Sequence, residues 1–209
     1  AHARNSFVNE GKVGEIMALE NTAVVAERAC PEETRVVMVA VTPGTDHSKS
    51  WGPGLGWVFP EHTVKVNVRG GDRRIGFFDG QQEQLSVSYG DAQRVWLRME
   101  LTKSGQVQAS VSTDDQQSWT QVGSCQLSAG ERPQKVRIGK MDAEGGQRDF
   151  EEQGVAGRSR IESFRLLGEL PATAAGEAAN RWAYLKEVEV EVHYELYDNL
   201  PVFCKWITV

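Results

Sequence analysis

Apolar and polar residues alternate with a period of two along much of this chain, and turn residues interrupt the alternation at short intervals. Val64, Val66 and Val68 alternate with polar neighbours, and residues 34–41 form a nearly continuous apolar run rich in β-branched residues. A period of two places alternate side chains on one face of a strand, and a short apolar run bounded by turn residues is typical of a buried strand. Both segments are therefore predicted to be β-strands.

The same signature recurs in seven further segments, namely residues 56–59, 74–78, 84–88, 94–102, 106–113, 134–139 and 160–167. The segments between them contain residues expected of antiparallel hairpins, namely Gly70-Gly71-Asp72, Asp79-Gly80, Tyr89-Gly90-Asp91 and Lys103-Ser104-Gly105. Only residues 11–20 and 172–180 have a helical pattern. The pattern predicts an all-β fold, an antiparallel β-sandwich or jelly roll.

A second alternating region follows an alanine-rich stretch near the end of the chain. Val188, Val190 and Val192 share one face of a predicted strand, and Asp198-Asn199 turns the chain into residues 200–209 as the partner strand. A lone hairpin is not stable in water, so it must belong to a larger sheet or dock on another domain. We predict a β-sandwich over residues 1–170, a linker over 171–180, and a hairpin over 181–209 that begins a second β domain.

Composition narrows the class of protein and of partner. The chain is 40% hydrophobic and 25% charged with 21 glycines, as in a soluble globular protein rich in turns. A net charge of −6 with scattered Lys and Arg argues against nucleic acid, and no apolar run approaches the ~18 residues of a membrane span. Cys30, Cys125 and Cys204 lie far apart without CxxC spacing, which excludes a zinc finger and leaves the redox compartment open.

Residues 50–60, Ser-Trp-Gly-Pro-Gly-Leu-Gly-Trp-Val-Phe-Pro, place Trp51 and Trp57 around three glycines. Glycine has no side-chain bulk, so such a run brings the backbone close to a ligand or to a neighbouring strand. An indole is a flat platform for a sugar ring and also a large core side chain. The sequence leaves both alternatives open, for the glycines and for the indoles.

The strand order resembles that of concanavalin A-like lectin/glucanase domains, which include LamG-like jelly rolls. The resemblance is carried by residues 51–57, by Ile-Gly-Phe-Phe-Asp at 75–79, by Val-Trp-Leu-Arg-Met-Glu-Leu at 95–101 and by residues 161–166. It covers residues 18–170 and implies a carbohydrate-related β-sandwich. Because that superfamily includes sugar binders, glycosidases and purely structural modules, the resemblance does not choose among these functions.

Residues 112–119, Ser-Thr-Asp-Asp-Gln-Gln-Ser-Trp, are similar to the Asp-box turn of sialidases and other carbohydrate-active β proteins, Ser-x-Asp-x-Gly-x-Thr-Trp. The resemblance implies a structural role, in which Asp114 accepts hydrogen bonds from turn amides and Trp119 packs beneath the turn. Gln116 stands where the motif has glycine, which departs from the expected turn geometry.

Residues 192–201, with Lys205-Trp206, resemble an early hairpin of the β-supersandwich domain in melibiase-like α-galactosidases and related glycoside hydrolases. This resemblance implies that the chain is the amino-terminal part of a larger glycosidase-like protein. A downstream catalytic domain of the same polypeptide is then its expected partner. An extracellular or periplasmic location follows from the resemblance and not from cysteine usage.

No catalytic constellation is evident in the sequence. A retaining glucanase needs two carboxyl groups about 5–5.5 Å apart, and the run Glu-x-Asp-x-x-Glu that resembling families use is missing. Glu187, Glu189 and Glu191 share a strand face but are typical of the solvated side of an edge strand. The histidines lie in unrelated segments, and no Gly-x-Ser-x-Gly elbow occurs. We predict no catalytic residue, and enzymatic activity of this chain alone is the less favoured alternative.

Residues around the Gly-Pro-Gly segment are the candidates for carbohydrate binding. A sugar site needs a flat aromatic face and a few polar side chains that bond to hydroxyl groups. Trp51 and Trp57 are the candidate platforms, and the candidate polar groups are Asp46, His47, Arg74 and Asp79.

Loop oxygens leave calcium as an alternative, although no metal ligand is assigned. The segments Thr45-Asp46-His47-Ser48 and Gly71-Asp72 carry oxygens of the kind that bind calcium. Asp142, Glu144 and Asp149 come closer in number, but a solvated acidic loop explains them better.

Together the patterns predict a non-catalytic accessory module of a carbohydrate-active, glycoside hydrolase-like protein, and carbohydrate binding by the module is a hypothesis that depends on exposed indoles. One alternative is a structural or protein-interaction β-sandwich with no ligand, and another is a glycoside hydrolase in its own right. Exposure of Trp51 or Trp57 would favour the carbohydrate-binding interpretation, and burial of both would favour the structural one.

Overall fold

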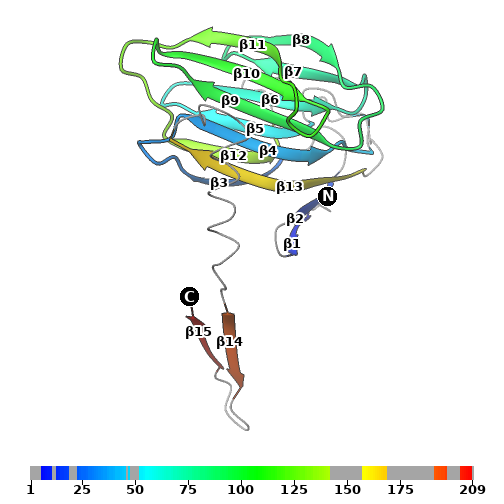
Figure 1. Ribbon diagram of the computed structural model, residues 1–209, viewed down its shortest axis with the longest axis vertical. Helices are drawn as coiled ribbons and strands as arrows, with labels where there is room; N and C mark the ends of the chain where they lie inside the picture. The colour runs from blue at the N-terminus through cyan, green and yellow to red at the C-terminus, as the bar shows by residue number, and fades with distance from the viewer. Residues whose placement is uncertain are drawn as a thin grey trace. The chain divides into compact units, whose positions relative to one another are not determined.

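The computed structural model of the chain describes residues 6–10, 13–18, 23–45, 47, 52–141, 157–168, 191–196 and 203–208. The chain divides into two compact units, Ala1–Glu169 and Leu170–Val209 (Figure 1). Every secondary-structure element of the described residues is a β-strand. None of these residues belongs to a helix long and apolar enough to span a membrane.

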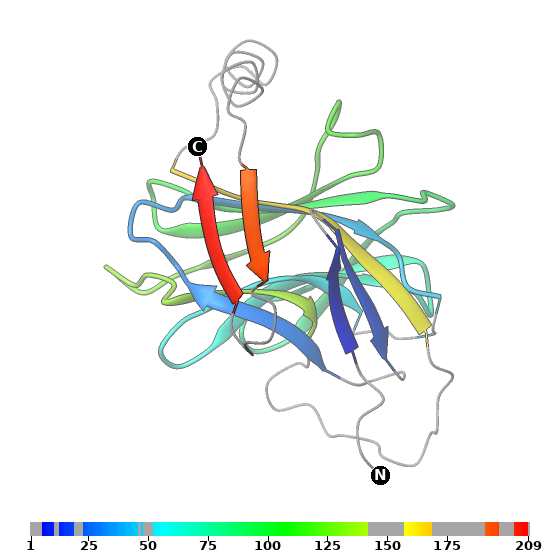
Figure 2. The same ribbon diagram turned by 90° about the horizontal axis from the view of Figure 1, so that it is seen from below.

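Two antiparallel sheets form the first unit and lie face to face as layers (Figure 1). The seven-stranded sheet has the order β1 (Ser6–Glu10), β2 (Val13–Ala18), β13 (Gly157–Leu167), β4 (Val36–Thr42), β9 (Val95–Leu101), β10 (Gln106–Ser112) and β11 (Thr120–Gln126). The six-stranded sheet has the order β3 (Val24–Ala29), β12 (Lys135–Lys140), β5 (Pro53–Val58), β6 (Thr63–Arg69), β7 (Arg74–Phe78) and β8 (Glu83–Ser88). Figure 2 shows the dark blue strands β1 and β2 beside yellow β13.

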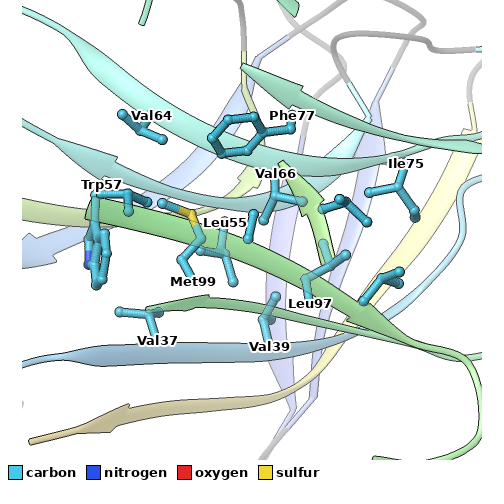
Figure 3. Packing of buried hydrophobic residues seen from close by; sticks show 14 of the residues in the cluster. Val37, Val39, Leu55, Trp57, Val64, Val66, Ile75, Phe77, Leu97 and Met99 are labelled. Carbon is cyan, nitrogen blue, oxygen red and sulfur yellow. The ribbon is translucent and has the colours of Figure 1, made fainter. Parts of the chain in front are cut away.

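The core fills the space between the two sheets, as the alternation of apolar residues predicts. Apolar side chains of both sheets point toward one another and are fully buried (Figure 3). Each such side chain contributes about 1.5–3 kcal/mol of burial free energy. The seven-stranded sheet supplies Val37, Val39, Leu97 and Met99, and the six-stranded sheet supplies Leu55, Trp57, Val66, Ile75 and Phe77.

The predicted all-β antiparallel sandwich is confirmed, but two local predictions are wrong. Within the predicted helical stretch 11–20, the described residues Val13–Ala18 are not helical but form β2, which pairs with β1 and β13. Pairing on both sides overrides the weak helical propensity of so short a segment. The Tyr89-Gly90-Asp91 turn joins β8 to β9, which lie in different sheets, so it does not close a hairpin. Residues 172–180 lie outside the described residues.

A neighbouring strand explains the glycines of the Gly-Pro-Gly segment. A Cβ atom on Gly52 would lie 1.7 Å from the backbone oxygen of Val68, and one on Gly54 would lie 2.1 Å from that of Val66. Real Cβ atoms do not approach backbone so closely, so these positions require glycine for the contact with β6. Of the two alternatives that the sequence left open, the close approach is therefore to protein and not to a ligand.

The second unit contains one described hairpin. Strand β14 (Glu191–Leu196) pairs antiparallel with β15 (Phe203–Thr208), with Glu191 opposite Thr208 and Leu196 opposite Phe203. The predicted linker, residues 171–180, lies outside the described residues.

Candidate functional site

Of the two alternatives that the sequence left open for Trp57, sugar platform or core residue, the structure shows the core residue. Its side chain is 0% exposed and lies in the core, on β5 between Val136 of β12 and Val64 of β6 (Figure 3). Its position in an inward-facing register removes both indole faces from solvent. Trp51 and Asp46 lie outside the described residues.

The other predicted polar residues do not form one group. His47 is exposed, and Arg74 is exposed at the start of β7. Asp79 follows the last residue of β7, so it lies about 17 Å from Arg74 along an extended strand at about 3.4 Å per residue. The strand therefore separates two side chains that the sequence placed together as candidates.

Asp79 caps the turn between β7 and β8. Its Oδ1 accepts hydrogen bonds from the backbone amides of Gln81 and Gln82, each at 2.9 Å, and its Oδ2 accepts one from Gln84 Nε2 at 3.2 Å. Partial burial acts to raise the pKa of Asp79, but the hydrogen bonds outweigh it and lower the pKa below its usual value. Both oxygens of the Asp79 carboxylate are therefore engaged in hydrogen bonds within its own hairpin.

Asp114 organises the turn between β10 and β11. Its Oδ1 accepts hydrogen bonds from Ser118 N at 3.0 Å and from Ser112 Oγ at 2.7 Å, and its Oδ2 accepts one from the Ser118 hydroxyl. The Ser118 hydroxyl is the main cause that lowers the pKa of Asp114 to about 2. Asp115 and Gln116 have φ of 56° and 73°, in the left-handed region that favours glycine. Gln116 adopts this conformation at the position where the motif has glycine.

The strained turn brings Asp115 onto the outer face of the seven-stranded sheet. Asp115 Oδ1 accepts a hydrogen bond from Trp96 Nε1 at 2.8 Å. Trp96 lies on β9 between the inward-facing Val95 and Leu97, so its indole points away from the core. The exposed fraction of Trp96 is nevertheless only 2%. Strained non-glycine residues often occur at functional sites, so the face that Asp115 contacts is a candidate functional site.

Seven side chains gather on this face, and we call them the outer cluster: Arg94, Trp96, Arg98, Asp115, Trp119, Glu162 and Arg165. The guanidinium carbons of Arg94 and Arg165 lie 5.0 Å and 5.1 Å from the ring centroid of Trp96, within the range of cation–π attraction. Two arginines therefore share one indole.

Both carboxylates of the outer cluster are held by Arg94. Arg94 Nε lies 3.0 Å from Glu162 Oε2, and Arg94 Nη1 lies 3.6 Å from Asp115 Oδ1. Glu162 Oε1 also accepts a hydrogen bond from Thr42 Oγ1 at 2.6 Å. With Trp96 bonded to Asp115, each carboxylate already has two polar partners. The pair therefore serves to orient Arg94 and Trp96.

Arg98 differs from Arg94 because it has no carboxylate partner among the described residues. Its guanidinium carbon lies 4.2 Å from the ring centroid of Trp119, and its Nε is buried without a hydrogen-bond partner in the described part of the chain. Burial lowers the pKa of Arg98, and the charge of Glu100 opposes this. Both Arg98 and Trp119 are half-buried, so each keeps some access to solvent.

No group of three or more His, Cys, Asp or Glu side chains that could hold a metal ion occurs among the described residues. At the Gly71-Asp72 loop, the Asp72 carboxylate is bonded to Arg69 Nε at 3.1 Å and to Arg69 Nη2 at 2.6 Å. Asp142, Glu144 and Asp149 lie outside the described residues.

Sequence analysis missed the outer cluster, apart from the structural role it gave Trp119. Arg94, Trp96 and Arg98 alternate along one strand, which is a signal that they share a face. Nothing in their spacing indicates that Arg165, from the last strand of the sandwich, lies over the same indole. That contact depends on β4, which pairs with both β9 and β13.

Comparison with known proteins gives a fold and no family. No family model matches the chain, and no curated protein matches it. A GH43 glycoside hydrolase, engineered to display both endo-xylanase and exo-arabinofuranosidase activity, has a similar structure with a TM-score of 0.50 and 12% identity. The likeness covers 78% of this chain and 36% of that chain, so this chain spans about a third of the enzyme's length.

The first unit has a concanavalin A-like fold. A more distant similar structure is the β-glucanase of Bacillus licheniformis, with a TM-score of 0.42, 11% identity and coverage of 73% of this chain and 70% of that one. Another is the exoplasmic/lumenal domain of VIP36 bound to Ca²⁺ and Man3GlcNAc, with a TM-score of 0.45, 12% identity and coverage of 85% and 87%. At these identities the likeness describes the concanavalin A-like sandwich alone.

Proposed function

We propose that this chain is a non-catalytic, carbohydrate-binding module of a larger carbohydrate-active protein. The observation that carries the proposal is the pair formed by Trp119 and Arg98 on the outer face of the seven-stranded sheet. Trp119 is an indole with access to solvent, and Arg98, whose guanidinium lies over one face of that indole, is a hydrogen-bond donor with no carboxylate partner in the described residues. An aromatic face next to a planar polar group is the basic requirement of a sugar site.

The surroundings of Trp119 support a sugar-binding role. Ser110 pairs with both Arg98 and Gln121 across β9, β10 and β11, so these three residues lie in one row on the same face. Ser110 is buried, but the half-buried guanidinium of Arg98 and the exposed amide of Gln121 are donors and acceptors suited to sugar hydroxyls. In this proposal the apolar face of a sugar ring stacks on the face of Trp119 that the Arg98 guanidinium does not cover, and polar groups of the row bond to the hydroxyl groups.

The non-catalytic part of the proposal rests on the carboxylates of the outer cluster. Glycoside hydrolysis needs one carboxyl group as acid and a second as base or nucleophile, both free to reach the substrate. Asp115 and Glu162 are instead engaged with Trp96, Arg94 and Thr42. The GH43 structure supports the modular part, because the likeness covers only 36% of that enzyme, where a similar sandwich is one part of a longer chain.

The test is calorimetric titration of the chain with neutral xylo-, arabino-, gluco- and galacto-oligosaccharides. We expect binding in the wild type and at least tenfold weaker binding in Trp119→Ala, since one stacked ring contributes about 1–3 kcal/mol by analogy with base stacking on aromatic side chains. Gln81→Ala, in the exposed β7–β8 turn, is the matched control and should bind as the wild type does. Far-UV circular dichroism verifies that each variant is folded. Absence of binding to every glycan, or undiminished binding in a folded Trp119→Ala, would refute the proposal.

Burial of Trp57 favours a second candidate, a structural or protein-interaction domain without a ligand. The large hydrophobic side chains of the described residues offer little surface for such a partner, because Val25, at 42% exposed, is the one that is exposed. Failure of all glycans to bind would leave this candidate as the preferred function.

We further propose that residues 1–170 form the β-sandwich domain, that residues 171–180 are a linker, and that residues 181–209 begin a second β domain. The boundary between the two compact units, which falls between Glu169 and Leu170, supports this organisation. In this arrangement a catalytic domain of the same polypeptide is the expected neighbour of the module.

A further inference from the structure

Three arginines converge on the outer face of the seven-stranded sheet although the chain as a whole is acidic, with a net charge of −6. Arg98 of β9 and Arg165 of β13 both pair with Met38 on β4, so they lie in one row, two strands apart. At about 4.8 Å between strands, their Cα atoms lie about 10 Å apart. Met38, with 6% of its surface exposed, lies between them.

The carboxylates in direct contact with an arginine on this face are those beside Arg94, while Glu100, two residues from Arg98 on the same face of β9, acts on Arg98 by its charge without an ion pair. Arg94 contacts both Glu162 and Asp115, whereas Arg98 has no ion pair among the described residues and its side-chain Nε has no hydrogen-bond partner there. Burial and the positive charge of Arg94 lower the pKa of Arg165, and Asp115 opposes this. The positive charge of Arg98 is therefore incompletely balanced by the described part of the protein.

A half-buried guanidinium without a directly bonded carboxylate is costly, because a charge taken from water needs a partner to compensate its lost solvation, and the Glu100 charge acts on it without an ion pair. The attraction of the Trp119 ring, about 0.5–2 kcal/mol for a cation–π contact, returns only part of this cost. A bound anion would supply the missing partner, and a guanidinium binds carboxylate or sulfate through paired N–H groups in one plane.

We propose that the outer face of the seven-stranded sheet binds an acidic glycan, with a sugar ring on Trp119 and a carboxylate or sulfate group at Arg98, on the side toward Arg165. The inference rests on the proposed carbohydrate-binding function and names the class of sugar. Uronate and sulfate ester groups share the required chemistry, because each presents two or more oxygens to one guanidinium fork. The orienting pairs of Arg94 with Glu162 and Asp115 keep that arginine out of direct anion binding.

The test compares tetragalacturonate with its neutral methyl ester, and a sulfated galactose tetrasaccharide with its unsulfated form, by calorimetry at low and high salt. We expect at least tenfold tighter binding of either acidic glycan than of its neutral counterpart, and a preference that falls as salt rises. Binding of the galacturonate identifies the anionic group as a uronate carboxylate, and binding of the sulfated tetrasaccharide identifies it as a sulfate ester. Equal affinity for acidic and neutral glycans would overturn the inference while leaving the proposed function intact, and no binding to any glycan would overturn both.

Variants locate the anionic group. Arg98→Gln should abolish the preference for the acidic glycan, and Arg98→Lys, which keeps the charge but lacks the planar fork, should retain part of it. Arg132→Gln, at an exposed loop position, is the charge-matched control and should leave the preference unchanged. A full preference in folded Arg98→Gln would overturn the assignment. If that variant does not fold, the wild-type comparison of acid with ester still decides the proposal.

Discussion

Replacing Gly123 with alanine perturbs the packing between the two sheets at one defined contact. Gly123 lies on β11 opposite the buried Ala109 of β10. A Cβ atom at Gly123 would lie 2.2 Å from Cδ1, 2.5 Å from Cγ and 2.9 Å from Cβ of Phe77 in the facing sheet. Phe77 is 0% exposed, so its ring has no solvent to move into. The added methyl group therefore forces the two sheets or the ring to shift.

The magnitude follows from two opposing effects. Overpacking a buried site costs about 1–3 kcal/mol, whereas alanine restricts the unfolded chain and returns about 0.5–1 kcal/mol. The net expectation is a loss of about 1–2 kcal/mol in the free energy of unfolding, which lowers the Tm of a chain of this size by roughly 2–8 °C. Without the contact, the same substitution would raise the Tm, so the sign of the change is diagnostic.

Thermal and urea unfolding, followed by circular dichroism, measure the effect. Gly168→Ala is the control, because its new Cβ atom would lie 3.5 Å from the nearest atom, an ordinary contact. Phe77→Leu creates space at the contact, so we expect the double variant to be at least about 1 kcal/mol more stable than the sum of the single losses. A higher Tm in Gly123→Ala, or additive losses in the double variant, would refute the packing described for these two strands.

The turn between β10 and β11 supports two more predictions. Gln116→Gly should raise the Tm by about 1–2 °C, because relief of about 1–2 kcal/mol of left-handed strain exceeds the added unfolded-state entropy of glycine, and a lower Tm would contradict this. The pKa of Asp114 falls from its ordinary 3.8 to about 2, so its stabilising effect is complete above pH 3.8 and is lost as the pH falls through about 2. The Tm difference between wild type and Asp114→Ala should therefore shrink between pH 5 and pH 2, and a constant difference would argue against these hydrogen bonds.

Strands with strong alternation are predictable from sequence, and strands with weak alternation are not. Val64, Val66 and Val68 are fully buried in the core between the sheets, and Lys65 and Asn67 between them are fully buried too. The period of two in β6 therefore reflects an apolar and a polar face, not a buried and an exposed one. Thr120–Gln126 of β11 has few apolar residues, and its pairing shifts at a bulge beside β10, so no alternation indicates it. At an edge of the sheet, backbone hydrogen bonds to one neighbour suffice to form a strand.

The two tryptophans that matter most for the site have opposite outcomes. Trp57 has the local sequence of a sugar platform, with glycines beside it, yet those glycines serve the contact with β6 and its indole is core. Trp119 has the local sequence of a structural turn, yet it is the indole that lies beside Arg98 with access to solvent. Both neighbourhoods depend on strands that are distant in sequence.

The sequence by itself determined the all-β class, most of the central strands, and the turn built on Asp114, because these depend on alternation and on bonds between residues a few positions apart. The tertiary structure alone decided which face of each strand is covered by the second sheet, and hence that Trp57 is buried. It also decided that Arg98 and Arg165 lie in one row across Met38, since strand order is set by pairing between segments far apart in the chain. The alternation of apolar and polar residues shows which side chains share a face of a strand, but pairing between distant segments decides what that face contacts.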